Sequence, residues 1–322
     1  MNKMKHIVIV VLSVLLIIPV QSQAQKERYS SLQEALSAAG NFSTGRAPSN
    51  VTWIEDGEKY SFTKNDRFVQ EIWIKNVKNG KEEKVFSNED LTFPGSDRPF
   101  RYVSFAWTKD FNFILFQCNF KPIWRYSGNS DYYLYSLDDK TLDLIVEQAF
   151  SAEISPDGTK VGYGKDGNLY EYLLLTGEHV QFTDDAREQV YNGRFGWAQE
   201  EEFGLVQGWS WSNDSRYIAY WQSDETEVPV YRLTDFSGQH PEYMEVPYPK
   251  VGDNPPQVKI GVIDTDASSK EWLDIDLEGG YIPRIYWTSK PNTLAVMWMN
   301  RIQDHMKIWF YDVASSSRKL VM

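Results

Sequence analysis

Cysteine and histidine are scarce in this sequence of 322 residues, which contains one cysteine and four histidines. A single cysteine, Cys118, excludes an intrachain disulfide and any metal site built on paired cysteines. It lies in the apolar segment FILFQC, so we expect a buried and unreactive thiol. The histidines are scattered and none has the spacing of a metal ligand set. The sequence therefore predicts no cofactor and no metal ion.

Several enzyme motifs are also missing. There is no G-x-S-x-G nucleophile elbow, no H-E-x-x-H zinc motif and no phosphate-binding P-loop, so we assign no catalytic residue. GYGKDG, residues 162–167, matches the letters of a dinucleotide-binding pattern, but the strand-like segment NLYEYLL follows it where a helix would be needed. We interpret it as a hairpin turn.

Basic residues are fewer than acidic residues in this sequence. The chain has 33 basic and 45 acidic residues, which give a formal net charge of −12. A nucleic-acid-binding protein needs a basic face for the phosphate backbone. The balance of charge therefore argues against nucleic acid as a partner.

Long apolar runs are confined to the N-terminus. Lys3 and Lys5 precede an apolar stretch over residues 7–20, and small residues lead to a cleavage position after Ala24. The stretch is shorter than the roughly 20 residues of a membrane-spanning helix. This pattern predicts a signal peptide over residues 1–24 and an exported protein, periplasmic or extracellular.

Aromatic residues are abundant, with 12 Trp and 19 Tyr, and they recur in step along the chain. Five ten-residue segments align: WIEDGEKYSF from Trp53, WTKDFNFILF from Trp107, ISPDGTKVGY from Ile154, WSNDSRYIAY from Trp211 and WTSKPNTLAV from Trp287. Each begins with a large apolar residue, continues with a polar turn and ends with apolar residues at the eighth and tenth positions. A second strand-like segment follows most copies, as in EIWIKNV, DYYLYSL, NLYEYLL and KIWFYDV.

Repetition of strand, turn and strand predicts an all-β fold, a β-propeller, whose four-stranded blades surround a central channel. An open sandwich is the alternative, which the regular repeats disfavour. We place a lead-in segment at residues 25–50 and the propeller at residues 51–322. Five units in an open array would expose strand edges. We therefore expect an incomplete propeller that belongs to a longer protein.

The stretch WAQEEEFG puts three adjacent carboxylates, Glu200, Glu201 and Glu202, between Trp197 and Phe203. A run of like charges is more often a solvated surface than a site. The flanking aromatic rings favour a binding site, in which a cation neutralises the three carboxylates. A free α-amino group suits this place because carboxylates accept its N–H donors in charge-assisted hydrogen bonds.

Three segments in this order, NGRFGWAQEEE, SNDSRYIAYWQSDETEVPVY and EVPYPKVGDNPPQVKIGVIDTD, resemble the propeller domain of the dipeptidyl peptidase IV family of prolyl oligopeptidase-type serine peptidases. WRYSGNSDYYLYSL, from Trp124, is similar to the family's segment with a substrate-binding arginine. The resemblance covers roughly residues 30–322. It implies a propeller of about eight blades and a Ser-Asp-His triad in a C-terminal α/β-hydrolase domain, which nothing in this chain matches.

The resemblance also implies roles for individual residues. Glu201 and Glu202 would bind the N-terminal ammonium of a peptide, Glu200 has no assigned contact, and Arg125 would bind the carbonyl of the second substrate residue. Anchoring the amino terminus leaves the bond two residues in at the nucleophile. The implied protein is a secreted serine exopeptidase that gates its substrates and releases N-terminal Xaa-Pro or Xaa-Ala dipeptides. Without the triad, the chain alone should be inactive.

The implied partners are peptides with a free N-terminus and the C-terminal α/β-hydrolase domain of the same full-length protein; a homodimer is also compatible with the resemblance. Two other classes stay open. One is a non-catalytic propeller that binds peptide amino termini or protein partners, and the other is a structural repeat protein. The glutamates together with Arg125 favour the first two classes over the third.

Overall fold

The computed structural model describes residues 29–39, 48–54 and 57–322. The chain divides into two units, Met1–Val51 and Thr52–Met322. In the first unit, Leu32–Ala39 form helix α2. The predicted signal peptide lies outside the described residues. Among the helices in these three ranges, none is long and apolar enough to cross a bilayer.

The rest of the described chain forms consecutive antiparallel sheets of four or five strands. The first two sheets contain β1 (Ser49–Ile54), β2 (Lys59–Asp66), β3 (Val69–Asn76) and β4 (Glu82–Ser87), then β5 (Ser104–Trp107), β6 (Phe113–Pro122), β7 (Gly128–Ser136) and β8 (Leu142–Ala149). The third contains β9 (Ser151–Ile154), β10 (Lys160–Lys165), β11 (Asn168–Leu173) and β12 (His179–Gln181).

The fourth sheet has an additional strand and two insertions. It contains β13 (Val190–Asn192), β14 (Trp209–Trp211), β15 (Tyr217–Asp224), β18 (Gln257–Asp264) and β19 (Ser269–Trp272). The fifth sheet contains β20 (Tyr281–Trp287), β21 (Thr293–Met299), β22 (Met306–Asp312) and β23 (Ser317–Leu320). Helix α3 (Trp197–Phe203) lies between β13 and β14 in the chain. The hairpin of β16 (Val230–Asp235) and β17 (Glu242–Pro247) is inserted between β15 and β18.

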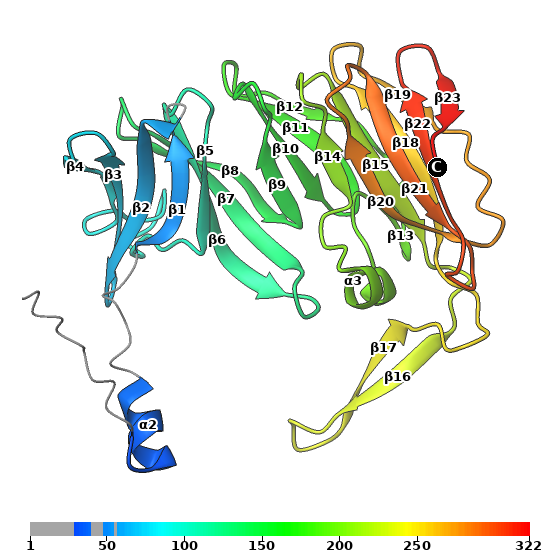
Figure 1. Ribbon diagram of the computed structural model, residues 1–322, viewed down its shortest axis with the longest axis horizontal. Helices are drawn as coiled ribbons and strands as arrows, with labels where there is room; N and C mark the ends of the chain where they lie inside the picture. The colour runs from blue at the N-terminus through cyan, green and yellow to red at the C-terminus, as the bar shows by residue number, and fades with distance from the viewer. Residues whose placement is uncertain (1–28, 40–47, 55–56) are drawn as a thin grey trace, which may run out of the picture. The chain divides into compact units, whose positions relative to one another are not determined.

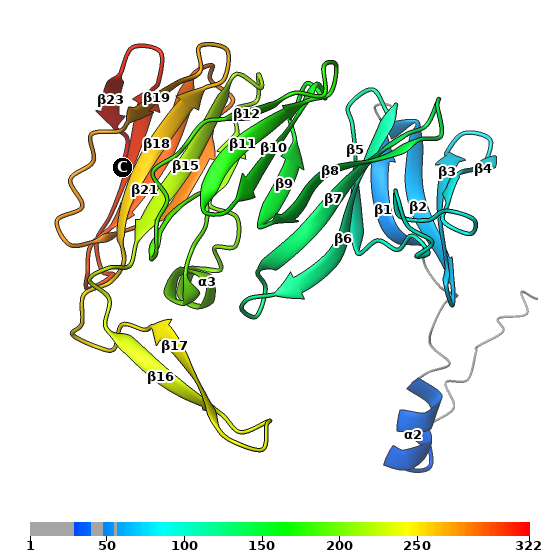
Figure 2. The same ribbon diagram turned by 180° about the vertical axis from the view of Figure 1, so that it is seen from behind.

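The sheets of the second unit follow one another side by side in chain order, from the blue and cyan strands to the orange and red ones (Figure 1), and the view from behind shows the same succession (Figure 2). These sheets are propeller blades, so the predicted all-β propeller fold is confirmed. In each blade the aligned ten-residue segment joins the first strand of the repeat to the next one.

The alternating apolar residues of the repeats are buried between neighbouring blades. Side chains two positions apart on a strand share one face of the sheet. The apolar residues at the eighth and tenth positions are accordingly buried together in four blades: Ile114 with Phe116, Val161 with Tyr163, Ile218 with Tyr220, and Leu294 with Val296. The period-two pattern therefore predicted the interior of the molecule correctly.

The tryptophans that open the repeats connect neighbouring blades. Their indole N–H groups donate hydrogen bonds to the preceding sheet: Trp107 to Ser61 Oγ (3.0 Å), Trp211 to the Glu153 carbonyl oxygen (3.3 Å) and Trp287 to the Ser210 carbonyl oxygen (3.1 Å). The third unit has Ile154 at this place, which has no such donor. Tryptophan thus provides both apolar area and a donor for an acceptor in the adjacent blade.

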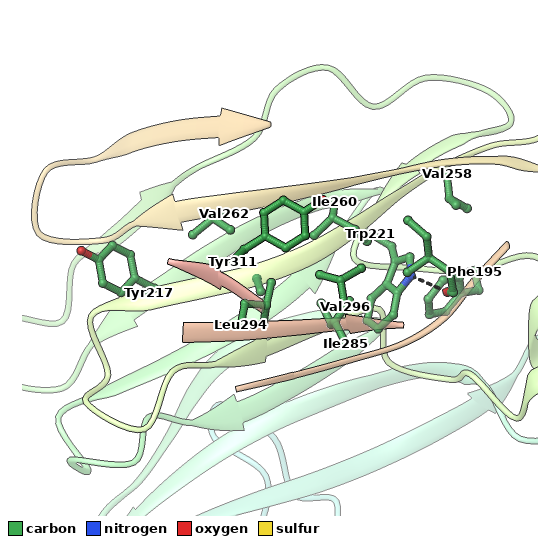
Figure 3. Packing of buried hydrophobic residues seen from close by; sticks show 12 residues of the cluster. Phe195, Tyr217, Trp221, Val258, Ile260, Val262, Ile285, Leu294, Val296 and Tyr311 are labelled. Carbon is green, nitrogen blue, oxygen red and sulfur yellow. Dashed lines mark hydrogen bonds between the residues drawn. The ribbon is translucent and has the colours of Figure 1, made fainter. Parts of the chain in front are cut away.

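A large apolar cluster between the fourth and fifth sheets anchors the segment that leads to α3 (Figure 3). Phe195 packs edge-on against Trp221, with ring centroids 5.4 Å apart. The Trp221 indole N–H donates to the carbonyl oxygen of Ile282, at 3.0 Å. The entry to α3 is therefore fixed by the core of the propeller.

Two predictions about single segments are confirmed. GYGKDG is a hairpin: Lys165 pairs with Asn168, and both loop residues, Asp166 and Gly167, have positive φ (51° and 76°), as a tight turn between two strands requires. Cys118 is a free, fully buried thiol, and burial raises its pKa, which keeps it in the unreactive protonated form.

Candidate functional site

The acidic stretch is a single short helix, α3, with glycine on both sides. Gly196 is extended before the first turn (φ −86°, ψ −172°). Gly204 ends the helix in the left-handed region (φ 63°, ψ 32°), where its N–H bonds to the Glu200 carbonyl oxygen at 3.0 Å. Successive residues of a helix point about 100° apart because each turn has 3.6 residues. The three glutamates therefore face three different directions.

Aromatic contacts hold both ends of α3. The Trp197 ring lies over Tyr248 with ring centroids 4.4 Å apart. At the other end the ring of Phe203 meets Tyr281 edge-on at 5.5 Å. The aromatic residues that flank the glutamates in the sequence thus fix the helix against two other segments.

Glu200 is the structural member of the acidic run. Its side chain is 1% exposed. Its Oε1 atom accepts hydrogen bonds from the backbone N–H groups of Tyr126 (2.6 Å) and Ser127 (3.2 Å). A buried carboxyl group is tolerated when hydrogen-bond donors compensate for lost water. Glu200 therefore fastens α3 to the turn between β6 and β7.

That turn also contains Arg125, which forms an ion pair with Glu201. The Arg125 Nε atom lies 3.0 Å from Oε1 and 3.3 Å from Oε2 of Glu201. The arginine side chain is 64% exposed and the glutamate side chain 21%. The hydrogen bond and the charge of Glu201 raise the pKa of the Arg125 guanidinium. The pair is thus open to solvent on the arginine side, where a ligand can reach it.

Glu202 is exposed, and its carboxylate forms no hydrogen bond or ion pair with any other part of the chain that the structure describes. It lines a cavity of about 360 Å³ whose wall includes Phe203, Tyr281, Lys250 and Arg301. The Arg301 guanidinium donates to the Tyr281 hydroxyl and, at 2.6 Å, to the Asp253 carbonyl oxygen. Glu202 is therefore the member of the run that can accept hydrogen bonds from a ligand without first breaking a contact.

The structure brings the three predicted site residues to one place: Glu201 and Glu202 on α3, and Arg125 in the turn that α3 contacts. It also gives Glu200 a task that the sequence could not show. Nothing in three identical adjacent residues distinguishes the buried one from its neighbours. In the described ranges, no group of three or more His, Cys, Asp or Glu side chains is placed to hold a metal ion.

Comparison with known proteins relates this geometry to a family. The sequence model of the dipeptidyl peptidase IV (DPP IV) N-terminal region matches residues 108–322. The chain belongs to this family. The resemblance seen in the sequence is thereby confirmed, and the catalytic domain of such peptidases is absent from this chain.

Relatives of the DPP IV type occur in fungi and bacteria. The chain is 29% identical over 258 residues to a protein of Chaetomium globosum named "Probable dipeptidyl-aminopeptidase B", a match that covers 72% of this chain and 27% of that protein. It is 30% identical over 243 residues to the protein of the same name from Pyrenophora teres, with 66% and 26% covered. The crystal structure of Porphyromonas gingivalis dipeptidyl peptidase 4 superposes with a TM-score of 0.76 and 28% identity, covering 92% of this chain and 42% of that one. This DPP IV-type chain thus spans less than half the length of each relative.

Proposed function

We propose that this chain is the substrate-gating and N-terminus-binding propeller of an exported serine exopeptidase that releases N-terminal Xaa-Pro or Xaa-Ala dipeptides from peptides. The observation that carries the proposal is the ion pair of Arg125 and Glu201 next to the unpaired Glu202. The carboxylates provide acceptors for a peptide's ammonium group, and the guanidinium, 64% exposed, provides donors for its carbonyl oxygens.

The chemistry follows from charge and geometry. Glu201 and Glu202 accept hydrogen bonds from the ammonium group of the peptide, whose pKa of about 7.7–8.0 leaves most of it charged at neutral pH. Arg125 has donors beyond Nε, and its planar guanidinium directs them at the carbonyl oxygen of the second residue. Holding the peptide at its first two residues places the following bond at a fixed distance from the site.

The nucleophile would come from a C-terminal α/β-hydrolase domain of the same full-length protein, as in serine peptidases that resemble it. A propeller that binds peptide amino termini without cleaving them is the second candidate, since the site residues would be the same. The two differ in one respect: only the first hydrolyses a dipeptidyl amide.

The test uses the full-length protein and two substrates, an Xaa-Pro chromogenic amide with a free amino group and its N-acetylated form. Acetylation should abolish turnover because it removes the positive charge. Glu201→Gln and Glu202→Gln should each lower kcat/KM for the free substrate by roughly 30-fold to several thousand-fold, since a broken charged contact costs about 2–5 kcal/mol. Glu83→Gln, an exposed glutamate of the first sheet, is the matched control and should have no effect.

Equal turnover of the free and acetylated substrates would refute ammonium recognition. Effects of Glu201→Gln and Glu202→Gln as small as that of Glu83→Gln would show that these two glutamates are only part of a solvated surface. Binding of free peptides without hydrolysis would favour the non-catalytic alternative.

A further inference from the structure

Glu225 is a buried acid that the proposed recognition of peptides does not use. It follows directly after β15 and its side chain is 3% exposed. Its backbone is fixed on both sides: its N–H donates to the Gln189 carbonyl oxygen (2.8 Å), and its own carbonyl accepts from the Val228 N–H (2.9 Å). Burying a carboxyl group costs free energy unless specific partners compensate, so its partners identify its task.

The carboxyl group lies against Gly196, the residue immediately before α3. The nearby Gly196 N–H favours the charged form of this carboxyl group and so opposes the rise of its pKa. The fit is close, because a Cβ atom built on Gly196 would overlap the carboxyl group of Glu225. The φ of Gly196, −86°, is accessible to every amino acid. Glycine is therefore needed here for the space that Glu225 occupies and not for its backbone freedom.

Arg194 acts on Glu225 through its charge. Its positive charge favours the ionised carboxylate, whereas the neighbouring Asp224 opposes it. The guanidinium lies 5.3 Å from the ring centroid of Phe150 and 4.8 Å from that of Tyr191, which restrict its movement. Arg194 thus contributes a positive charge to the surroundings of Glu225, whereas the direct contact of the Glu225 carboxyl group is with Gly196.

The contact between Glu225 and Gly196 bears directly on the glutamates of α3. The carbonyl oxygen of Gly196 accepts the Glu200 N–H, at 3.4 Å, in the first turn of α3. A shift of Gly196 therefore shifts the helix. We propose that Glu225 is a positioning residue, which through Gly196 sets the place of α3 and hence of Glu201 and Glu202. What those glutamates bind rests on the proposed function; the contact between Glu225 and Gly196 does not.

The experiment is a double-mutant cycle in the full-length protein, with a free-amine dipeptidyl amide as substrate. Glu225→Ala and Gly196→Ala should each raise KM by on the order of 10- to 100-fold, the size of effect that a misplaced binding group produces. The kcat should change by less than about threefold, since the ammonium contact exists before and during the reaction. The double variant should recover most of the loss because the new methyl group enters the space that Glu225 leaves.

Glu225→Gln has the same size and keeps an acceptor oxygen for the Gly196 N–H, so its KM should stay within about fivefold of the wild type. Glu227→Gln, two positions along the same loop and exposed, is the matched control and should leave KM unchanged. Strictly additive losses in the cycle, or a fall in kcat with KM unchanged, would overturn the proposal. So would a glutamine variant as defective as Glu225→Ala.

A second readout separates this proposal from the function on which it rests. If Glu201→Gln and Glu202→Gln leave turnover unchanged, peptide recognition by α3 is wrong. Amide hydrogen exchange of residues 196–204 then tests the contact between Glu225 and Gly196 alone, because exchange reports local opening of the helix. Exchange should become faster in Gly196→Ala and Glu225→Ala and stay the same in Glu227→Gln. Unchanged exchange in the first two variants would overturn the positioning role.

Discussion

Arg125 and Glu201 stand 76 positions apart in the sequence, yet the Nε atom of the arginine lies 3.0 Å from Oε1 of the glutamate. The arginine comes from a turn of the second sheet and the glutamate from a helix inserted in the fourth. Glu200, next to Glu201, binds the backbone of the same turn. The two segments thus form one unit in which the position of Arg125 depends on the carboxylates of α3.

The first prediction concerns the shape of the Arg125 side chain. Arg125→Ala should lower kcat/KM of the full-length protein by about 10- to 150-fold, which corresponds to the loss of a hydrogen bond of about 1.5–3 kcal/mol to a charged group. Arg125→Lys should restore little, because an ammonium group lacks the planar set of donors. Arg67→Lys, at an exposed hairpin turn, serves as the control. Full activity of Arg125→Lys would show that Arg125 and Glu201 form only a surface ion pair, in which the positive charge matters and the planar guanidinium does not.

The second prediction concerns Glu200. Glu200→Ala leaves the N–H groups of Tyr126 and Ser127 without their acceptor. An unsatisfied buried donor costs about 1–3 kcal/mol, so the loss of the acceptor for both donors should lower the free energy of unfolding by about 2–6 kcal/mol. Glu200→Gln keeps one acceptor oxygen and should cost less. Denaturant titration measures both against Glu83→Ala; a loss no larger than that of the control would show that water replaces the carboxylate.

The third prediction is a pH dependence of stability that arises from Glu225. Burial raises its pKa from 4.5 to about 7, with Asp224 acting in the same direction and Arg194 and the Gly196 N–H opposing it. Between these two values the folded protein retains a proton that the unfolded chain has lost, so stability decreases as pH rises and levels off above about 7.

The raised pKa of Glu225 lowers the free energy of unfolding by about 3 kcal/mol above pH 7, at 1.36 kcal/mol per pKa unit. Glu225→Gln cannot titrate. The difference in unfolding free energy between wild type and this variant should therefore slope across pH 5 to 7 and be flat above it, as measured by denaturant titration in a pH series. A constant difference across that range would contradict the prediction.

The fourth prediction concerns the contact between blades. Trp211→Phe removes the indole N–H that bonds to the Glu153 carbonyl oxygen and keeps an aromatic ring in the buried interface. It should lower the unfolding free energy by about 1–2 kcal/mol. Trp272→Phe is the matched control, because Trp272 is 38% exposed and no described residue accepts a hydrogen bond from its indole. Equal losses in the two variants would assign the effect to ring size alone.

The sequence by itself determined the repeating part of the protein. Alternation at the eighth and tenth positions, as in Ile218 and Tyr220, is a local property of a strand with one buried face, and so the blades could be predicted from spacing alone. The hairpin at Asp166 and Gly167 was likewise predictable, because a tight turn depends on its own residues. The signal peptide over residues 1–24 stays a prediction.

Tertiary structure decided what the acidic residues do. Three identical neighbours, Glu200 to Glu202, differ only because the helix turns each carboxylate toward different surroundings: the backbone of the β6–β7 turn, the Arg125 guanidinium, or a cavity. The contact of Glu225 with Gly196 depends on the pairing of β13 with β15, which no local pattern encodes. Side-chain periodicity depends on residues close together in the sequence. The partner of a charged group depends instead on which distant segment the packing of the blades brings within hydrogen-bonding distance.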